Sequence, residues 1–146
     1  MAPTQANPKR PSPAEYRQAG ELRRAFQAFI RQTELVTRKH GLTTERYQLL
    51  LFVKLAASGG NGATVGGLAS ELSLAKSTVT QLVRRAQDLK LVRRELSEVD
   101  ARIRYLFLTE EGERRLAAAV GELGDERSAL FELLEHLGDA PTGARA

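Results

Sequence analysis

The stretch TVGGLASELSLAKSTVTQLVRRAQDLKLVRR, residues 64–94, decides the fold. Its first part predicts a short helix over about 65–71, although two adjacent glycines weaken it. A second helix is predicted over about 75–89, after Ser73. At about 100° per residue, the apolar residues of this second helix gather on one face. These residues are Val79, Leu82, Val83, Ala86 and Leu89.

The opposite face of the 75–89 helix is polar and carries a single acid, Asp88, at its far end. Glutamine pairs well with adenine and arginine with guanine, whereas short hydroxyls and helix N-terminal amides suit phosphate. An ordinary amphipathic helix would more often carry mixed Lys/Glu pairs on this face. The pattern therefore favours a surface that contacts DNA. Its residues are Lys76, Ser77, Thr78, Thr80, Gln81, Arg84 and Arg85.

Outward from this helix the residue pattern changes. Residues 91–96 and 102–108 are rich in β-branched, leucine and aromatic residues, and a polar segment, 97–101, separates them. This predicts a hairpin whose loop is longer than a two-residue turn. The order of helix, turn, helix and hairpin within 64–108 is that of a winged helix-turn-helix. We therefore predict a mainly α fold with a small β wing.

Helices are also predicted on both sides of this region. Ser12-Pro13-Ala14-Glu15 is a typical helix start, and Gly41 is a typical stop. Another helix begins at Thr43 or Thr44, and the glycine-rich segment 58–62 ends it. We expect this helix to bury Tyr47, Leu50, Leu51, Val53 and Leu55.

A last helix is predicted to begin after Thr109, which can cap it. Gly121 and Gly124 suggest a break, but the +4, +3 spacing of its apolar positions continues through them, so one long helix to about 138 is favoured over two helices. The first helix has the same spacing, and two such stripes favour packing across a dimer, with burial inside one subunit as the alternative. The candidate dimerisation residues are Leu22, Phe26, Phe29, Val120, Leu123, Leu130, Leu134 and Leu137.

Together these patterns predict five segments. A mobile tail, 1–11, precedes an N-terminal dimerisation helix, 12–42. The winged helix-turn-helix spans 43–109, and a C-terminal dimerisation helix spans 110–138. Residues 139–146 form a second tail.

Composition narrows the function further. Net charge is +4, yet residues 74–109 carry eight Lys/Arg against four Asp/Glu, and residues 110–146 carry four against nine. This asymmetry suits a polyanion on one surface. Cysteine is absent and the two histidines are far apart, so we expect no metal site. The sequence has no enzyme motif, no membrane-spanning run and no signal peptide, so we expect a cytoplasmic protein that is not an enzyme.

The chain resembles the multiple antibiotic resistance regulator (MarR) family from about Gly41 to Arg115. The resemblance rests on GLTTERYQLLLFV (41–53), residues 64–94 and VDARIRYLFLTEEG (99–112), above all on Asp100-x-Arg102 followed by Leu108-Thr109-x-x-Gly112. It implies that Arg102 enters the minor groove and that Asp100 holds Arg102 in place. Lys90 departs from the family, which usually has glycine there, so the turn is expected to differ. The C-terminal region is also expected to be shorter than the family's usual two helices.

The resemblance implies a homodimeric repressor of a near-palindromic operator, relieved by a small aromatic or anionic effector. It adds Asp100 and Arg102 to the candidate DNA-binding residues, and Arg104, from the same basic segment, is a further candidate. Residues Tyr16, Arg23, Arg24, Arg31 and Tyr47 are candidates for an effector pocket, with surface or core roles as alternatives. Without cysteine, the family's peroxide-sensing mode is excluded. The competing hypothesis is a winged-helix module that binds protein instead of DNA, and salt dependence distinguishes the two.

Overall fold

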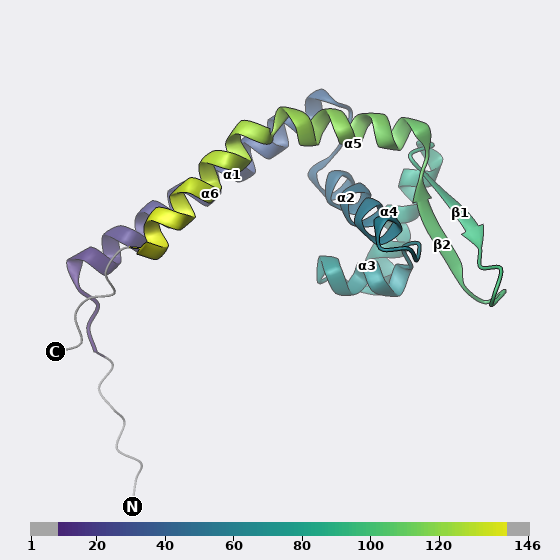
Figure 1. Cartoon of the computed structure of the whole chain (residues 1–146), viewed down its shortest axis with the longest axis horizontal. Coiled ribbons are helices and arrows are strands. Elements are labelled where there is room, and N and C mark those ends of the chain that lie inside the picture. The colour runs from purple at the N-terminus through teal and green to yellow at the C-terminus, as the bar shows by residue number, and fades with distance from the viewer. Residues whose placement is uncertain (1–8, 140–146) are drawn as a thin grey trace, which may run out of the picture. The chain divides into compact units, whose positions relative to one another are not determined.

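The computed structural model describes residues 9–139, so residues 1–8 and 140–146 of the two predicted tails lie outside the described residues. The described chain is mainly helical with one two-stranded antiparallel sheet, as predicted (Figure 1). Its elements are α1 (Pro13–Lys39), α2 (Thr44–Ser58), α3 (Val65–Leu72), α4 (Lys76–Asp88), β1 (Val92–Leu96), β2 (Arg104–Leu108), α5 (Glu110–Glu122) and α6 (Gly124–Asp139).

The described residues form two compact units. One comprises residues 32–124, and the other comprises residues 9–31 together with 125–139. In the first unit, α2, α3 and α4 pack around a shared apolar core, and the hairpin of β1 and β2 lies beside them (Figure 1). The central side chains of this core are Leu49, Leu50, Val53, Val79, Val83, Leu91 and Leu106.

One core prediction for α2 is wrong. Leu55 is 56% exposed, whereas Leu49, which was not expected inside, is fully buried. Leu49, Leu50 and Val53 share one helical face, and at about 100° per residue Leu55 lies on the other side. Tyr47 and Leu51 are partly buried against the same core.

The predicted start and end of α1 are confirmed. The backbone N–H of Ser12 donates to Oε2 of Glu15 at 2.6 Å, and the backbone N–H of Glu15 donates to Oγ of Ser12 at 3.2 Å. The bond from the Ser12 N–H to the carboxylate lowers the pKa of Glu15. After α1, Gly41 has a φ of 71°, in the left-handed region that glycine adopts at low cost. Capping chemistry therefore sets both ends.

The wing is an antiparallel pair in which Val92 lies opposite Leu108 and Leu96 opposite Arg104. Ala63, just before α3, adds a one-residue bridge to this sheet. Its N–H donates to the carbonyl of Leu106 at 3.3 Å, and the N–H of Leu106 donates back at 2.7 Å. This bridge, which the sequence pattern did not predict, ties the start of the helix-turn-helix to the wing.

The turn between α4 and β1 keeps a left-handed residue even though that residue is lysine. Lys90 has a φ of 57°, and its N–H donates to the carbonyl of Gln87 at 2.9 Å. The next N–H, of Leu91, donates to the carbonyl of Ala86 at 2.9 Å. These two bonds form a Schellman motif, which compensates for the roughly 1 kcal/mol that a non-glycine residue costs there. The expectation of a different turn is therefore wrong.

The C-terminal region is two helices, α5 and α6, and the prediction of one long helix is wrong. Leu123 separates them, with φ −85° and ψ 7°, and its N–H donates to the carbonyl of Ala119 at 3.0 Å. Leu123 is 2% exposed and packs with Val36 and Ala119. Because a single residue leaves the helix, the heptad spacing continues past the break, and spacing alone did not reveal it.

Candidate nucleic-acid interface

The outward face of α4 is a polar, exposed surface. Its inward residues Val79, Val83 and Ala86 are fully buried, which fixes the rotation of the helix about its axis. The candidates Lys76, Ser77, Thr78, Gln81, Arg84 and Arg85 are all exposed. Thr80 is half-buried, and its Oγ1 donates to the carbonyl of Lys76 at 2.8 Å. Six of the seven α4 candidates thus lie together on one free face.

Two features of this face suit an anion. Lys76, Arg84 and Arg85 form no ion pair with any residue between 9 and 139. The residue at the N-cap is Ala75, which provides no side-chain acceptor for the first N–H groups of α4. Helix N-terminal amides without a cap are ready donors to phosphate. The face thus offers unneutralised cations and backbone donors.

The end of α4 is held to the wing by a contact that the sequence pattern did not predict. Nε of Arg94, on β1, donates to Oε1 of Gln87, on α4, at 3.1 Å. Beside it, the guanidinium of Arg93 lies 5.0 Å from the ring centroid of Phe107 and pairs with Glu95. The two adjacent arginines, Arg93 and Arg94, stand out in the sequence. The sequence does not show that they contact Phe107 and Gln87.

The loop of the wing is ordered by hydrogen bonds from main-chain N–H groups to side-chain oxygens. Oδ1 of Asp100 accepts from the backbone N–H of Arg102 at 3.0 Å, and Oγ of Ser97 accepts from the N–H of Asp100 at 3.2 Å. The expected side-chain pair between Asp100 and Arg102 is therefore not formed. A carboxylate two residues before an amide closes an Asx-turn more readily than it reaches a long guanidinium. Asp100 shapes the loop and leaves the Arg102 guanidinium exposed and without an ion-pair partner among the described residues.

Arg104, the last wing candidate, is exposed at the start of β2. The wing thus presents two free arginines on the strand and loop, while Arg93 and Arg94 are engaged closer to α4. The candidate DNA-binding residues of α4 and of the wing therefore lie in the same compact unit, residues 32–124.

A clamp at the base of the wing explains the motif Leu108-Thr109-x-x-Gly112. Thr109 Oγ1 donates to the carbonyl of Lys90 at 2.6 Å and accepts from the N–H of Gly112 at 3.1 Å. The backbone N–H of Thr109 also donates to the carbonyl of Leu91 at 3.0 Å. A Cβ on Gly112 would lie 2.1 Å from the carbonyl oxygen of Leu91. Glycine is therefore required for α5 to approach the strand this closely.

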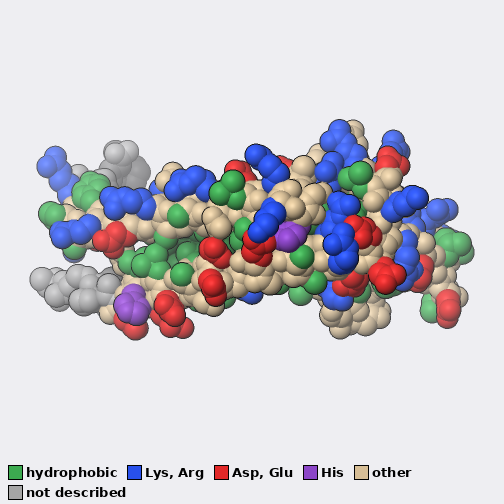
Figure 2. Space-filling model, turned by 90° about the horizontal axis from the view of Figure 1, so that it is seen from above, with side chains coloured by type: hydrophobic (Ala, Val, Ile, Leu, Met, Phe, Trp, Pro, Cys, Tyr) green, Lys and Arg blue, Asp and Glu red, His purple; other side chains and the backbone are tan. Residues whose placement is uncertain are grey.

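The candidate dimerisation residues differ in how much surface they leave free. Leu123 is buried in its own chain, and Val120 packs against the main core. In the unit of residues 9–31 and 125–139, Phe26 is 40% exposed and Leu134 is 36% exposed, and Leu22, Phe29, Leu130 and Leu137 are half-buried. Figure 2 shows apolar side chains at the surface between the two helices of this unit.

Carboxylates on α5 form two exposed ion-pair clusters. Glu122 accepts from Nζ of Lys39 at 2.6 Å and lies 2.5 Å from Nε2 of His40, and these bonds, with Lys39 first, lower its pKa. Hydrogen bonds from Arg114 and then Arg115 lower the pKa of Glu111 to about 2. His40 thus has a structural partner. Within residues 9–139 no group of His, Cys, Asp and Glu is arranged to hold a metal ion.

The candidate effector residues are scattered. Tyr16, Arg23, Arg24 and Arg31 are exposed in the unit that includes residues 9–31, and Tyr47 is half-buried in the other unit. None of the described cavities is lined by any of these five residues.

Comparison with known proteins gives one family match. Residues 40–103 match the model described as MarR family. No curated protein matched the chain. Within residues 9–139, no helix has the length and apolar character needed to cross a membrane.

Solved structures with the same fold include MepR from S. aureus in complex with DNA, with a TM-score of 0.66 and 19% identity over 75% of this chain and 77% of that chain. The apo form of MarR from E. coli has a TM-score of 0.65 and 19% identity over 78% and 82%. MarR from Oenococcus oeni has a TM-score of 0.62 and 24% identity over 77% and 83%. The chain therefore has the winged-helix fold of these structures.

Proposed function

We propose that this chain, whose residues 40–103 match the model described as MarR family, is a regulator of that family, a homodimeric, sequence-specific DNA-binding regulator of transcription. The observation that carries the proposal is the outward face of α4. Six polar or basic candidates are exposed on it, its cations have no ion-pair partner among the described residues, and its N-terminus has no side-chain cap. DNA supplies phosphates and base edges as partners for the cations and hydrogen-bond donors of this face.

In the proposed complex α4 enters the major groove. Arg84, in the middle of the face, reaches the N7 and O6 acceptors of guanine, and Gln81, one turn earlier, reaches adenine. Ser77 and the uncapped amides of the first turn contact phosphate. The solved DNA complex of MepR supports a nucleic-acid role for this fold at low identity.

The wing reads a second feature of the duplex. Arg102, held forward by the turn that Asp100 closes, enters the minor groove, where a narrow groove concentrates negative potential. Arg104 contacts the adjacent phosphates. This division gives α4 the base-specific contacts and gives the wing a contact that depends on groove width.

Dimerisation would place one such reading surface on each half of a near-palindromic operator. The exposed apolar positions of α1 and α6, Phe26 and Leu134 among them, supply the surface for a partner chain. Half-sites about 10 base pairs apart, one helical turn, are then expected. A repressor relieved by a small aromatic or anionic effector remains the proposed mode of regulation.

The test uses the full chain and a duplex obtained by selection from a random library. We expect this duplex to bind tighter than its scrambled counterpart, and we expect log Kd to depend linearly on log salt with a slope that reflects several phosphate contacts. A footprint with two-fold symmetry is expected as well. Equal affinity for both duplexes, or affinity that does not change with salt, would contradict the proposal and favour a protein-binding module.

A further inference from the structure

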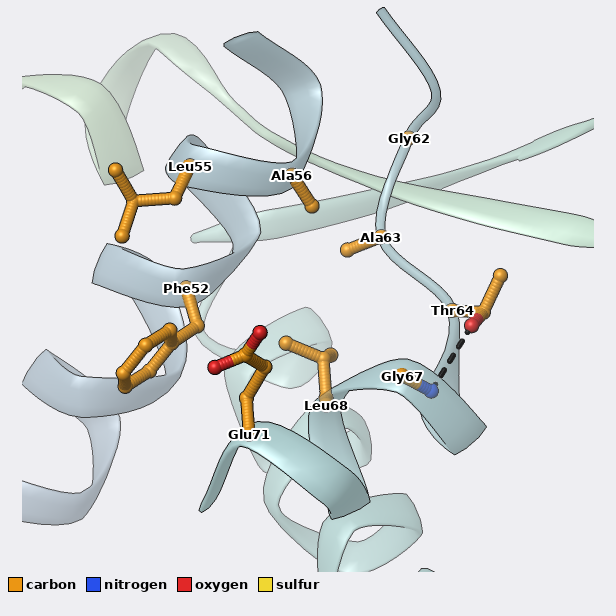
Figure 3. A pocket seen from close by; sticks show the side chains of 9 residues that line it. All are labelled: Phe52, Leu55, Ala56, Gly62, Ala63, Thr64, Gly67, Leu68 and Glu71. Carbon is orange, nitrogen blue, oxygen red and sulfur yellow. Dashed lines mark hydrogen bonds between the residues drawn. The ribbon is translucent and has the colours of Figure 1, made fainter. Parts of the chain in front are cut away.

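A cavity of about 320 Å³ lies between α2, α3 and the segment that precedes α3, and no predicted DNA-binding residue lines it. Its walls are mainly apolar, with Phe52, Leu55 and Ala56 on α2, Ala63 on the segment and Leu68 on α3 (Figure 3). The volume falls within the range of small-molecule sites. Leu55 is exposed on this wall, whereas a leucine that only stabilises the core would be buried.

Glu71 is the one ionisable side chain among the described residues that line this cavity. In Figure 3 its carboxylate lies between the ring of Phe52 and the side chain of Leu68. No hydrogen bond or ion pair joins the Glu71 carboxylate to another residue of the described chain. Lys54, a basic residue of α2, is engaged elsewhere, because its Nζ lies 2.8 and 2.9 Å from the two carboxylate oxygens of Glu113.

Other polar groups of the lining are already bonded within the protein. The N–H and the carbonyl of Ala63 both pair with Leu106, at 3.3 and 2.7 Å. Oγ1 of Thr64 accepts from the N–H of Gly67 at 3.1 Å. These bonds fix the loop wall and the start of α3, and they leave the Glu71 carboxylate as the charged acceptor that the cavity offers to a ligand.

We propose that this cavity binds a small organic cation, an ammonium group carried on an aromatic or branched aliphatic body. The ammonium would pair with Glu71 and lie against the ring of Phe52, since a charge-assisted hydrogen bond and a cation–π contact both favour a cation there. The body would cover Leu55 and Leu68. An anion of the same shape is repelled by Glu71, and a neutral analogue lacks the charge. The inference does not rest on the proposed DNA binding.

The test is a titration of the ¹⁵N-labelled full chain with three probes of similar shape, namely phenethylammonium, 2-phenylethanol and phenylacetate. We expect phenethylammonium to bind at least about tenfold tighter than the other two, the ratio that one charged hydrogen bond supplies. Its amide shift changes should cluster in residues 52–56 and 62–71.

Variants assign the effect to the carboxylate. Glu71→Gln keeps the shape of the side chain and should weaken phenethylammonium binding at least about tenfold, whereas Glu71→Lys should favour phenylacetate. Glu98→Gln, which removes the same charge from the wing loop, should leave all three affinities unchanged. The proposal is overturned by equal binding of the three probes, by unchanged binding to Glu71→Gln, by shift changes elsewhere in the chain, or by no binding up to 10 mM (about −2.7 kcal/mol).

Discussion

Gly112 shows how one residue sets the distance between two elements. It lies in the first turn of α5, where a side chain would meet the carbonyl oxygen of Leu91 at 2.1 Å. That carbonyl already accepts from the N–H of Thr109. The glycine is therefore required by packing and not by a left-handed backbone.

Gly112→Ala should destabilise the fold by at least about 2 kcal/mol, because the obstacle is backbone that cannot rotate away. Gly121→Ala is the matched control in the same helix, since a Cβ there has no atom within 4 Å. It should stabilise by about 0.5–1 kcal/mol, the helix preference of alanine over glycine. Denaturant unfolding at one protein concentration measures both, and the same sign for the two variants would contradict this account of Gly112.

Which residues of a helix face outward could be predicted from the sequence, whereas the contacts and backbone conformations of residues in turns were harder to predict. The exposed face of α4 followed from periodicity, because the buried Val79 and Val83 fix which side faces outward. Asp100 was predicted to hold the side chain of Arg102, but it accepts from the backbone N–H of Arg102 instead. The geometry of the turn decides between these two partners, and sequence spacing does not give that geometry. Lys90 adopts the left-handed conformation because the Schellman bonds compensate its cost.

At the scale of elements, local signals set the order of helices and strands, while breaks and pairings depended on tertiary contacts. The caps of α1 and α5 were visible as Ser12 and Thr109. The break at Leu123 was not, because burial against Val36 and Ala119 fixes it. The bridge of Ala63 to the wing joins residues far apart in the sequence, and no periodicity reports such a pairing.

At the scale of the whole molecule, the proposed regulator would use two copies of the chain. Leu130→Glu combined with Leu134→Glu should yield monomers in sedimentation at micromolar concentration, because two buried charges without partners cost more than an apolar interface supplies. Leu96→Glu with Val99→Glu adds the same charge on exposed wing residues and should leave the dimer intact. A dimer that survives the α6 substitutions, or a parent protein that sediments at 16 kDa, would exclude α6 as the interface.

The central claim is that α4 and the wing divide the reading of DNA between them, and affinity for the selected duplex tests it most directly. Arg84→Ala should cost about 1–3 kcal/mol and relax preference at particular base pairs. Arg102→Ala should cost about as much, with an effect that follows A·T content and groove width. Asp100→Ala should resemble a weaker Arg102→Ala, since it removes the turn and keeps the arginine.

The control is Arg114→Ala, which removes one positive charge from a residue paired with Glu111 on α5. Each variant is titrated against the selected and the scrambled duplex at two salt concentrations. We predict that Arg84→Ala and Arg102→Ala lose affinity for the selected duplex while Arg114→Ala does not. If Arg102→Ala binds the selected duplex as tightly as the parent protein, the wing does not read DNA and the account is contradicted.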